Sequence, residues 1–370
     1  LIAWFSDAGK QPYHLVVVPQ KGDGPSRTIS LGESKMAWEP AWSPDGGYIA
    51  FVDDDVRIRV VDLKDGSVRT ADVGGSNLER GDNGLVWSSD SRWLAYTRTG
   101  ANHLRRVMVW DRQSDAVHPL TDPMADAFAP VWDHDGQHLY FLASTDVALG
   151  SGWANTSSMQ AEPRYGVYLV NLGAQTASPF ELRSDEEAKA SPVPASSEKE
   201  GGKKGKKGET KDAGPRPVRL DWPGLERRIL PLTLPVGAYR GLLAGPEGSV
   251  LVAENVPRGR TLRLQKYVLE KREAEVLVEG ISSVVVSADG KTMAFRRGRQ
   301  WFSAGTAAPV RDGGKAISVT LSMKVDRLEE WAQMFEEAWR YQRDYFYDPG
   351  MHGRNWNDVH NRYAPLLPHV

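Results

Sequence analysis

The sequence predicts an all-β fold, a β-propeller of six to seven four-stranded blades, followed by a C-terminal α-helical segment. Two observations carry this prediction. A turn that opens with Trp recurs every 45 residues, as Trp-Ser-Pro-Asp-Gly at 42–46, Trp-Ser-Ser-Asp-Ser at 87–91 and Trp-Asp-His-Asp-Gly at 132–136. A period of about 40 to 50 residues is typical of propeller blades. From Asp326 onward the apolar residues follow a helical period instead.

A short apolar strand follows each turn. The residues seven and nine positions after the turn-opening residue are apolar in every copy: Ile49 and Phe51, Leu94 and Tyr96, Leu139 and Phe141, and, in two degenerate copies that open at Ala244 and Val286, Leu251 and Ala253, Met293 and Phe295. Residues two apart on a strand share a face, so we expect each pair to pack into one layer between blades. Ile2 and Trp4 fit the same two positions.

A second hairpin rich in β-formers follows each of these strands. Examples are residues 58–62, which turn at 64–66, and 107–110, which turn at 112–114; further cases start at Tyr13, Tyr168, Leu264 and Trp301. This makes six nearly complete blades. A seventh blade, and the first strand of the first blade, are expected before Leu1, because the chain opens as if in the middle of a strand. We therefore expect a fragment of a longer protein, from which any signal peptide would be lost.

The propeller is expected to span residues 1–322, with a low-complexity insertion at 184–216. The insertion contains Ser-Pro-Val-Pro at 191–194 and Gly-Gly-Lys-Lys-Gly-Lys-Lys at 201–207, and it has no aromatic residue. Such a segment cannot bury enough apolar surface to become ordered, so we expect a disordered, solvated loop. A basic tether for an acidic partner is the alternative, which the interleaved acidic residues weaken.

Residues 323–370 are expected to be helical. The face of the first helix is apolar, comprising Leu328, Trp331, Phe335, Ala338, Trp339 and Phe346. Asp326 with Glu329 resembles a capping box, and Asp-Pro-Gly at 348–350 should end the helix. A second amphipathic segment, 356–367, carries Trp356, Val359 and Tyr363. This helical pair is too small to fold alone, so it should dock on something or continue past Val370.

Composition excludes several classes of function. The 370 residues carry a net charge of −2, which argues against nucleic acid as the main partner. No apolar run is long enough to span a membrane, so no membrane partner is expected. The chain contains no cysteine, which excludes disulfides, a thiol nucleophile and cysteine-ligated metals.

The motif search predicts no catalytic, cofactor-binding or metal site in this chain. There is no Gly-x-Ser-x-Gly elbow and no His-Glu-x-x-His, and the Gly-Lys run near Gly201 does not fit a phosphate loop. The turn aspartates are interpreted as turn caps. Histidines 103, 118, 134 and 138 are interpreted as surface or packing residues, and no motif places a serine or a carboxylate beside His352. Asn-Thr-Ser at 155–157 matches a glycosylation acceptor, a triplet common by chance.

Several segments together resemble the tricorn proteases. They are Val-Arg-Leu-Asp-Trp-Pro-Gly-Leu-Glu-Arg-Arg at 218–228, Leu-Pro-Val-Gly-Ala-Tyr-Arg at 234–240, Glu-Glu-Trp-Ala-Gln-Met-Phe-Glu-Glu-Ala-Trp-Arg at 329–340, Arg-Asp-Tyr-Phe-Tyr-Asp-Pro at 343–349 and Tyr-Ala-Pro-Leu at 363–366. The resemblance covers essentially the whole chain. It implies a seven-bladed propeller that leads into a helical core subdomain, a PDZ domain and a second core subdomain.

The resemblance also implies a function. Tricorn-like proteins are serine endopeptidases with a Ser-His-Ser-Glu arrangement, whose residues should lie beyond Val370, so no catalytic residue is carried onto this chain and the chain alone is predicted to be inactive. The propeller channel would guide unfolded peptides toward the active site. The resemblance further implies a homohexamer, partnered by the remaining core and PDZ domains, and commonly cytoplasmic, with export left open. No cofactor is expected.

Two other readings are kept. One is a non-enzymatic TolB-like propeller that binds a protein partner on its face, against which the aromatic helices argue. The other is a prolyl-oligopeptidase-type enzyme, which would need a Gly-x-Ser-x-Gly elbow downstream. A PDZ-like stretch in the following codons would favour the tricorn-like reading.

Overall fold

The computed structural model describes residues 1–6, 13–74, 83–145, 163–181, 216–256, 259–320 and 322–369. The chain divides into two compact units, Leu1–Ile317 and Ser318–Val370. Residues 318–320 and 322 therefore group with the helices, whereas the sequence predicted that they belong to the propeller. The larger part of the expected insertion at 184–216 lies outside the described residues.

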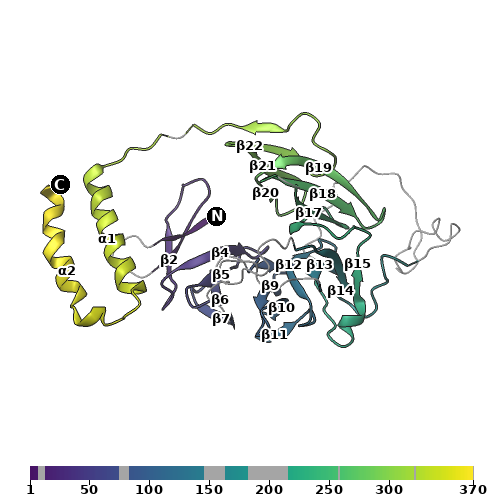
Figure 1. Ribbon diagram of the computed structural model, residues 1–370, viewed down its shortest axis with the longest axis horizontal. Helices are drawn as coiled ribbons and strands as arrows, with labels where there is room; N and C mark the ends of the chain where they lie inside the picture. The colour runs from purple at the N-terminus through teal and green to yellow at the C-terminus, as the bar shows by residue number, and fades with distance from the viewer. Residues whose placement is uncertain are drawn as a thin grey trace, which may run out of the picture. The chain divides into compact units, whose positions relative to one another are not determined.

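The first unit is a six-bladed β-propeller, as the repeat predicted (Figure 1). Blade one has three strands and blades two to six have four each, all paired antiparallel in chain order. Blade one comprises β1 (Ile2–Ser6), β2 (His14–Val18) and β3 (Arg27–Ser30). Blade two comprises β4 (Ala37–Trp42), β5 (Tyr48–Asp53), β6 (Arg57–Asp62) and β7 (Val68–Val73). Blade three comprises β8 (Val86–Trp87), β9 (Trp93–Thr99), β10 (Arg105–Asp111) and β11 (Ala116–Pro119).

The remaining blades follow the same order. Blade four comprises β12 (Asp126–Trp132), β13 (His138–Ser144), β14 (Gly166–Asn171) and β15 (Ile229–Pro231). Blade five comprises β16 (Tyr239–Ala244), β17 (Ser249–Asn255), β18 (Leu262–Val268) and β19 (Glu273–Ile281). Blade six comprises β20 (Ser283–Val286), β21 (Thr292–Arg297), β22 (Gln300–Gly305) and β23 (Lys315–Ile317). The chain between β14 and β15 includes the 3₁₀ helix Leu225–Arg228 and the insertion, so the insertion interrupts blade four.

The first strands of blades two to six form the inner ring. β4 contacts β8, β8 contacts β12, β12 contacts β16, and β16 contacts β20. Figure 1 shows β4, β12 and β20 nearer the middle of the propeller than the fourth strands β7, β11 and β15. Blade one begins at the strand that corresponds to β5, which agrees with the positions predicted for Ile2 and Trp4.

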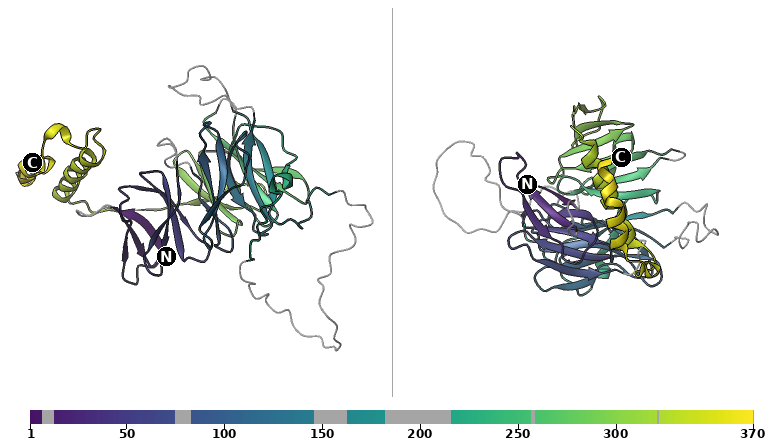
Figure 2. Two further views of the ribbon diagram at one scale, coloured as in Figure 1. Left: turned by 90° about the horizontal axis from the view of Figure 1, so that it is seen from below. Right: turned by 90° about the vertical axis from the view of Figure 1, so that its left-hand side faces the viewer.

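A hydrophobic core fills each of the five junctions between neighbouring blades. Ile49 and Phe51 pack against blade one, whereas Leu94 and Tyr96 pack against blade two. The other predicted pairs also stay together, Leu139 with Phe141, and Leu251 with Ala253 beside Met293 and Phe295. In the left view of Figure 2 the strands of the purple and blue blades run side by side, with neighbouring sheets facing each other. Burial of these apolar faces is the main stabilising contribution.

The predicted register of blade five is wrong by one residue. Ala244 pairs with Val250, whereas Trp42 and Trp132 pair with Ile49 and Leu139. The turn in blade five is therefore one residue shorter, and a shift of one residue moves every side chain to the other face of the strand. Val250 and Val252 consequently face blade four, while Leu251 and Ala253 face blade six.

The turn aspartates act as caps, as predicted. The carboxylate of Asp45 accepts hydrogen bonds from the Gly47 amide at 2.9 Å and the Ser43 hydroxyl at 2.5 Å. Asp289 makes the same pair of bonds in blade six, with Lys291 and Ser287. The next residue has positive φ, 70° at Gly46, 71° at Gly136 and 58° at Ser91. Glycine adopts this conformation at little cost, which explains its place in the repeat.

The second unit contains two helices that lie side by side (Figure 2). α1 (Arg327–Tyr345) is capped by Asp326, which accepts from the amides of Leu328 and Glu329, and α2 (Trp356–Tyr363) is capped by Asn355. Two hydrogen bonds of 2.9 Å join the helices, one from Trp339 Nε1 to the Trp356 carbonyl and one from Trp356 Nε1 to the Trp339 carbonyl. Phe346 lies just past the end of α1, so it is not part of the predicted face. A 3₁₀ turn, Ala364–His369, completes the described chain.

Candidate functional site

The inner ring is held together by tryptophan side chains. Trp87 donates from Nε1 to the carbonyl of Ala41 in blade two, and Trp132 donates from Nε1 to the carbonyl of Val86 in blade three, both at 3.1 Å. Each bond joins two residues 46 positions apart and runs from one blade to the blade before it. The turn tryptophans of the repeat therefore fix the distance between neighbouring first strands.

A bulge lies three residues before each turn tryptophan of the repeat, Trp42, Trp87 and Trp132. Glu39, Gly84 and Ala129 occupy this position, and all three have positive φ, 51°, 59° and 54°. In β4 and β12 the pairing register shifts across the bulge. Bulges of this kind redirect a side chain out of the ladder and are common next to functional sites. The repeat thus presents three equivalent positions on the inner ring with three different side chains.

Glu39 uses its position to bridge two blades. Its carboxylate accepts a hydrogen bond from the backbone amide of Asn83 at Oε1 and one from the amide of Gly84 at Oε2, both at 2.9 Å. Asn83 in turn donates from its side chain to the Thr97 carbonyl at 3.0 Å. The first strands of blades two and three are therefore joined by a carboxylate that sits on two consecutive amides.

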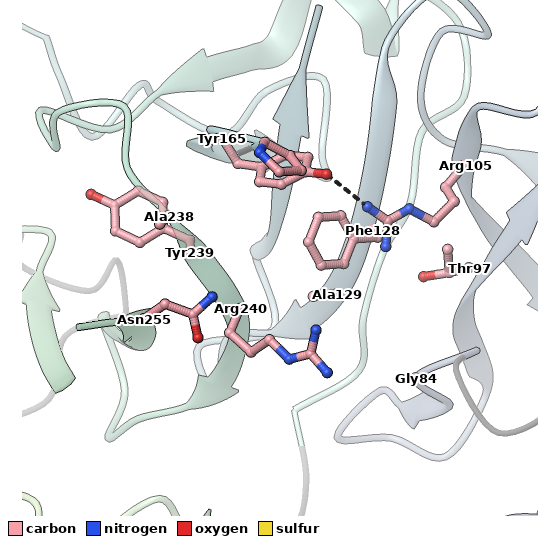
Figure 3. Close-up of a pocket in the computed structure, with 11 residues that line it drawn as sticks. Gly84, Thr97, Arg105, Phe128, Ala129, Tyr165, Ala238, Tyr239, Arg240 and Asn255 are labelled. Atoms are coloured by element: carbon pink, nitrogen blue, oxygen red, sulfur yellow. Dashed lines mark hydrogen bonds between the residues drawn. The ribbon is translucent and has the colours of Figure 1, made fainter. Parts of the chain in front are cut away.

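A cavity opens where the next bridge would lie, because Gly84 has no side chain. Its volume is about 320 Å³, and it lies among blades three, four and five (Figure 3). Its walls are Gly84, Thr97, Arg105, Phe128, Ala129, Pro163, Tyr165, Ala238, Tyr239, Arg240 and Asn255. Six of these residues lie on the first strands β8, β12 and β16 or within two residues of their starts, so the cavity belongs to the inner ring.

One wall of the cavity is a bonded cluster around Arg105. The guanidinium donates to the Asp126 carboxylate through Nε at 3.0 Å and through a terminal nitrogen at 2.7 Å, and it donates to the Tyr165 hydroxyl at 3.1 Å. The guanidinium carbon also lies 3.7 Å from the centre of the Phe128 ring, a cation–π contact. The Tyr165 hydroxyl donates to Asp126 at 3.2 Å. These contacts hold the wall in one arrangement.

The electrostatics of this wall follow from burial and pairing. Burial would raise the pKa of Asp126, but the hydrogen bonds and charge of Arg105 outweigh it, so the pKa of Asp126 is lowered. Burial raises the pKa of Tyr165, with Asp126 adding to the effect and Arg105 opposing it. Asp126 is therefore a carboxylate and Tyr165 a neutral phenol at neutral pH, and the charge of Arg105 is compensated.

The opposite wall comes from blade five. Tyr239 is buried and donates to the Pro235 carbonyl at 2.6 Å, and burial, followed by the nearby charge of Glu254, raises its pKa to about 12. Arg240 lies at the bulge of β16, where the register shifts between Tyr239 and Gly241. Figure 3 shows its guanidinium reaching from β16 into the space in front of Ala129. The site can therefore offer a cation, a phenol-rich wall and the amide of Asn255.

The structure places the other sequence candidates away from this cavity. His103 is exposed, His118 stacks on Trp222 at 4.3 Å between ring centres, and His134 is half-buried. Asp133, Asp135 and His138 form a group whose ligand atoms lie within 4.8 Å of one another, a spacing that could hold a metal ion. In the described part of the chain these side chains already have protein partners. Nδ1 of His138 contacts Asp135, and Asp133 accepts from the Tyr140 hydroxyl at 2.6 Å and the Gly248 amide at 3.0 Å.

His352 does have a carboxylate beside it, which no motif indicated. The Asp348 carboxylate lies 3.2 Å from Nδ1 of His352 and also accepts from the His352 backbone amide at 2.8 Å. The other ring nitrogen of His352, Nε2, is hydrogen-bonded to the Tyr347 hydroxyl, so its partner is a phenol and not a serine. The residue has a φ of 53° in the turn between the helices. The asparagine triplet at 155–157 lies outside the described residues.

Sequence reasoning missed the cavity, although part of its signal was visible. An alignment of the 45-residue repeat places Glu39, Gly84 and Ala129 at one position, which would have marked the change of side chain. The contributions of Arg105, Tyr165 and Arg240 depend on bulges and on the packing of three blades, which no local pattern shows. No helix in the described part of the chain is long and apolar enough to cross a bilayer.

The fold and the inner-ring cavity define a β-propeller protein with an appended helical unit. Residues 2–306 match the family model described as the tricorn protease second beta propeller domain, and residues 328–370 match the tricorn protease C1 domain. The first match alone covers well over half of the chain. The chain therefore belongs to the tricorn protease family.

Individual relatives agree with this assignment. "Tricorn protease homolog 1" of Streptomyces coelicolor is 29% identical over all of this chain and 35% of its own length. "Tricorn protease" of Thermoplasma volcanium is 23% identical over 88% of this chain and 30% of its own length. A crystal structure of the tricorn protease matches all of this chain with a TM-score of 0.75 at 16% identity, over 34% of that chain. The chain thus spans about a third of the length of these relatives.

Proposed function

We propose that this chain is the substrate-gating propeller and core-helix portion of a tricorn-like serine endopeptidase that degrades peptides. The observation that carries the proposal is the family propeller itself, whose bulged first strands present polar and aromatic side chains on the inner ring. A propeller has a central channel, and groups on its inner ring would meet any chain that passes through. Selection by channel width would act on unfolded peptides without a sequence requirement.

The helical unit supports the second half of the proposal. Leu328, Trp331 and Met334 of α1 are 57%, 39% and 60% exposed, and Met351 is the one buried apolar side chain in the described part of this unit. An exposed apolar face of this kind needs a partner. In the proposal that partner is the rest of the protease core. The remaining core and PDZ domains, a homohexameric assembly and a cytoplasmic location belong to the same proposal.

The channel role can be tested in the longer protein to which the proposal assigns this chain. Because the chain has no cysteine, a single introduced cysteine can be biotinylated selectively and capped with streptavidin. Val285 is exposed on β20 of the inner ring, and Val73 is exposed on the outer strand β7. A streptavidin plug at Val285→Cys should stop the cleavage of long peptides, whereas the same plug at Val73→Cys should leave it unchanged. Equal activity in both plugged proteins would contradict the gating role.

The absence of a catalytic centre in this chain is tested separately. The purified 370-residue chain should show no turnover of fluorogenic peptides and no labelling by an active-site phosphonate. Turnover that the phosphonate blocks would place a serine nucleophile within these residues. A non-enzymatic, protein-binding propeller is the alternative outcome, and it predicts that the longer protein also lacks activity.

A further inference from the structure

The inner-ring cavity carries a positive charge that its own walls do not neutralise. Two of its lining residues are arginines and none is acidic. Arg105 is compensated by the two-pronged contact with Asp126. Arg240 is exposed, and among the residues that the structure describes no carboxylate lies within ion-pair distance of it. The charges of the lining residues therefore favour an anion over a cation.

The neighbouring junction shows which anion this architecture accepts. Between blades two and three, the carboxylate of Glu39 sits on the amides of Asn83 and Gly84 with two bonds of 2.9 Å. Hydrogen bonds to a charged acceptor are stronger than those between neutral groups. The molecule thus contains, one repeat earlier, a carboxylate bound at the same level of the inner ring.

The cavity lies at the corresponding place between blades three and four. The repeat maps Glu39 onto Gly84, and Gly84 onto Ala129, with backbone φ angles within a few degrees of each other. A Cβ atom added at Gly84 would meet nothing within 4 Å. The space that the Glu39 side chain fills at one junction is therefore open at the next, and the amide of Ala129 takes the repeat position of the Gly84 amide.

We propose that this cavity binds the carboxylate group of a peptide, held by the Arg240 guanidinium and directed toward the Ala129 amide. A volume of about 320 Å³ accommodates more than a carboxylate group, so the residue that bears it also enters. Phe128, Tyr165 and Tyr239 then contact the rest of that residue. The carboxylate is either the C-terminus of the peptide or an acidic side chain. A peptide as its source rests on the proposed function, whereas the carboxylate site itself does not.

Binding to the 370-residue chain, measured by titration calorimetry, tests the proposal without any assay of cleavage. The probes are acetyl-dialanine, its C-terminal amide, and acetyl-aspartyl-alanine amide. Acetyl-dialanine binding identifies a C-terminal carboxylate, and binding of the aspartyl peptide identifies a side-chain carboxylate. The uncharged amide should not bind. If the three peptides bind equally, or none binds, the proposal is wrong, whatever the outcome of the plug experiment.

Substitutions locate the binding. Arg240→Gln should weaken the affinity for the bound probe on the order of tenfold, the usual effect of losing one charged hydrogen-bond donor. Arg299→Gln removes the same charge from an exposed position in blade six and should leave the affinity unchanged. Equal loss in both variants would show a general charge effect and would overturn the site.

A second pair of variants needs no ligand. Gly84→Glu places a carboxylate at the position of blade three that corresponds to Glu39 in blade two. It should block probe binding and raise the unfolding midpoint relative to Gly84→Gln, which has the same size without the charge. Adding Arg240→Gln should remove that difference, since the two positions are then uncoupled. If Gly84→Glu and Gly84→Gln unfold at the same midpoint, the cavity has no preference for a carboxylate and the proposal fails.

Discussion

The junction between blades two and three and the junction between blades three and four are built from one repeat but closed in different ways. Both have an indole bond of 3.1 Å, from Trp87 in the first and from Trp132 in the second. At the bulge, the first has the carboxylate bridge of Glu39, and the second has Gly84 and the cavity. The repeat keeps the contact that sets blade spacing and varies the side chain that faces inward.

The two junctions also differ at the turns. In the first, the Ser91 hydroxyl accepts from the Asp45 amide at 3.0 Å. In the second, the equivalent residue is Gly136, and the chain that follows the insertion packs there instead: the Val218 amide donates to Asp90 at 2.8 Å, and Trp93 donates from Nε1 to the Val218 carbonyl at 3.1 Å. The first junction is thus closed by its own side chains at both the bulge and the turn. The second is closed at the turn by a returning segment, and its bulge position is left open.

Removal of the turn tryptophan, which both junctions share, should have the largest effect on stability. Trp87 and Trp132 are 8% and 6% exposed and lie in the cores of their respective junctions. Replacement of either by alanine should lower the free energy of unfolding by about 3 to 5 kcal/mol, the usual cost of truncating a buried aromatic residue. Urea titration of both variants checks this. A clear difference between the two would show that the junctions do not depend on tryptophan equally.

This shared element is also the part of the fold that the sequence reveals. The Trp turns and the apolar pairs such as Leu139 and Phe141 are local and periodic, so they predicted the blades and their layers. Blade five was misread because its turn is one residue shorter, which the degenerate sequence from Ala244 to Ser249 does not show. Period alone fixes the existence of a blade, but the length of each turn fixes its register.

Removal of the Glu39 carboxylate bridge should have the next largest effect on the free energy of unfolding. Glu39→Ala removes two charged hydrogen bonds to the Asn83 and Gly84 amides, and we expect a loss of about 2 kcal/mol in the free energy of unfolding. Glu39→Gln should recover part of the loss, because one amide oxygen still accepts. Glu226→Ala, at a side chain that is 71% exposed, serves as the control and should change little. An equally small effect at Glu39 would mean that the bridge does not stabilise the junction.

The cavity lay beyond prediction for a physical reason. Tyr165 follows Arg105 by 60 residues and Arg240 follows Tyr165 by 75, so the three meet only because three blades pack around one point. Their roles depend on which arginine is already paired, and the pairing of Arg105 with Asp126 is a tertiary contact. The sequence could show that position 84 lacks the side chain of position 39, but not that an arginine from blade five faces the gap.

The two ends of β12 should respond oppositely to pH. The pKa of Asp126, at the cavity, is lowered by Arg105 despite burial, so its contribution to stability is present above its unfolded pKa of about 3.9 and is lost as the pH falls through the lower folded pKa. Burial, followed by the charge of Asp135, raises the pKa of Asp133, at the turn. Its carboxylate therefore lowers stability as the pH rises from about 3.9 through the higher folded pKa.

Urea titrations across this acidic range check the two signs. Asp126→Asn should flatten the increase of unfolding free energy with pH, and Asp133→Asn should remove a decrease. The matched substitutions have the same size and the same loss of charge, so each serves as the control for the other. Curves shifted in the same direction by both variants would show that the two carboxylates do not have opposite environments.

The smallest effect concerns the turn link between blades two and three. Ser91 is fully buried, has a φ of 58°, and its hydroxyl accepts from the Asp45 amide. Ser91→Ala keeps the strained backbone and loses the bond, so it should cost about 1 kcal/mol. Ser91→Gly loses the same bond but relieves a left-handed conformation that costs a non-glycine residue about 1 kcal/mol, so the two changes should nearly cancel. If both variants are destabilised equally in urea titrations, the backbone at Ser91 is not strained. If neither is, the hydroxyl contributes nothing, and the turn link does not stabilise the first junction.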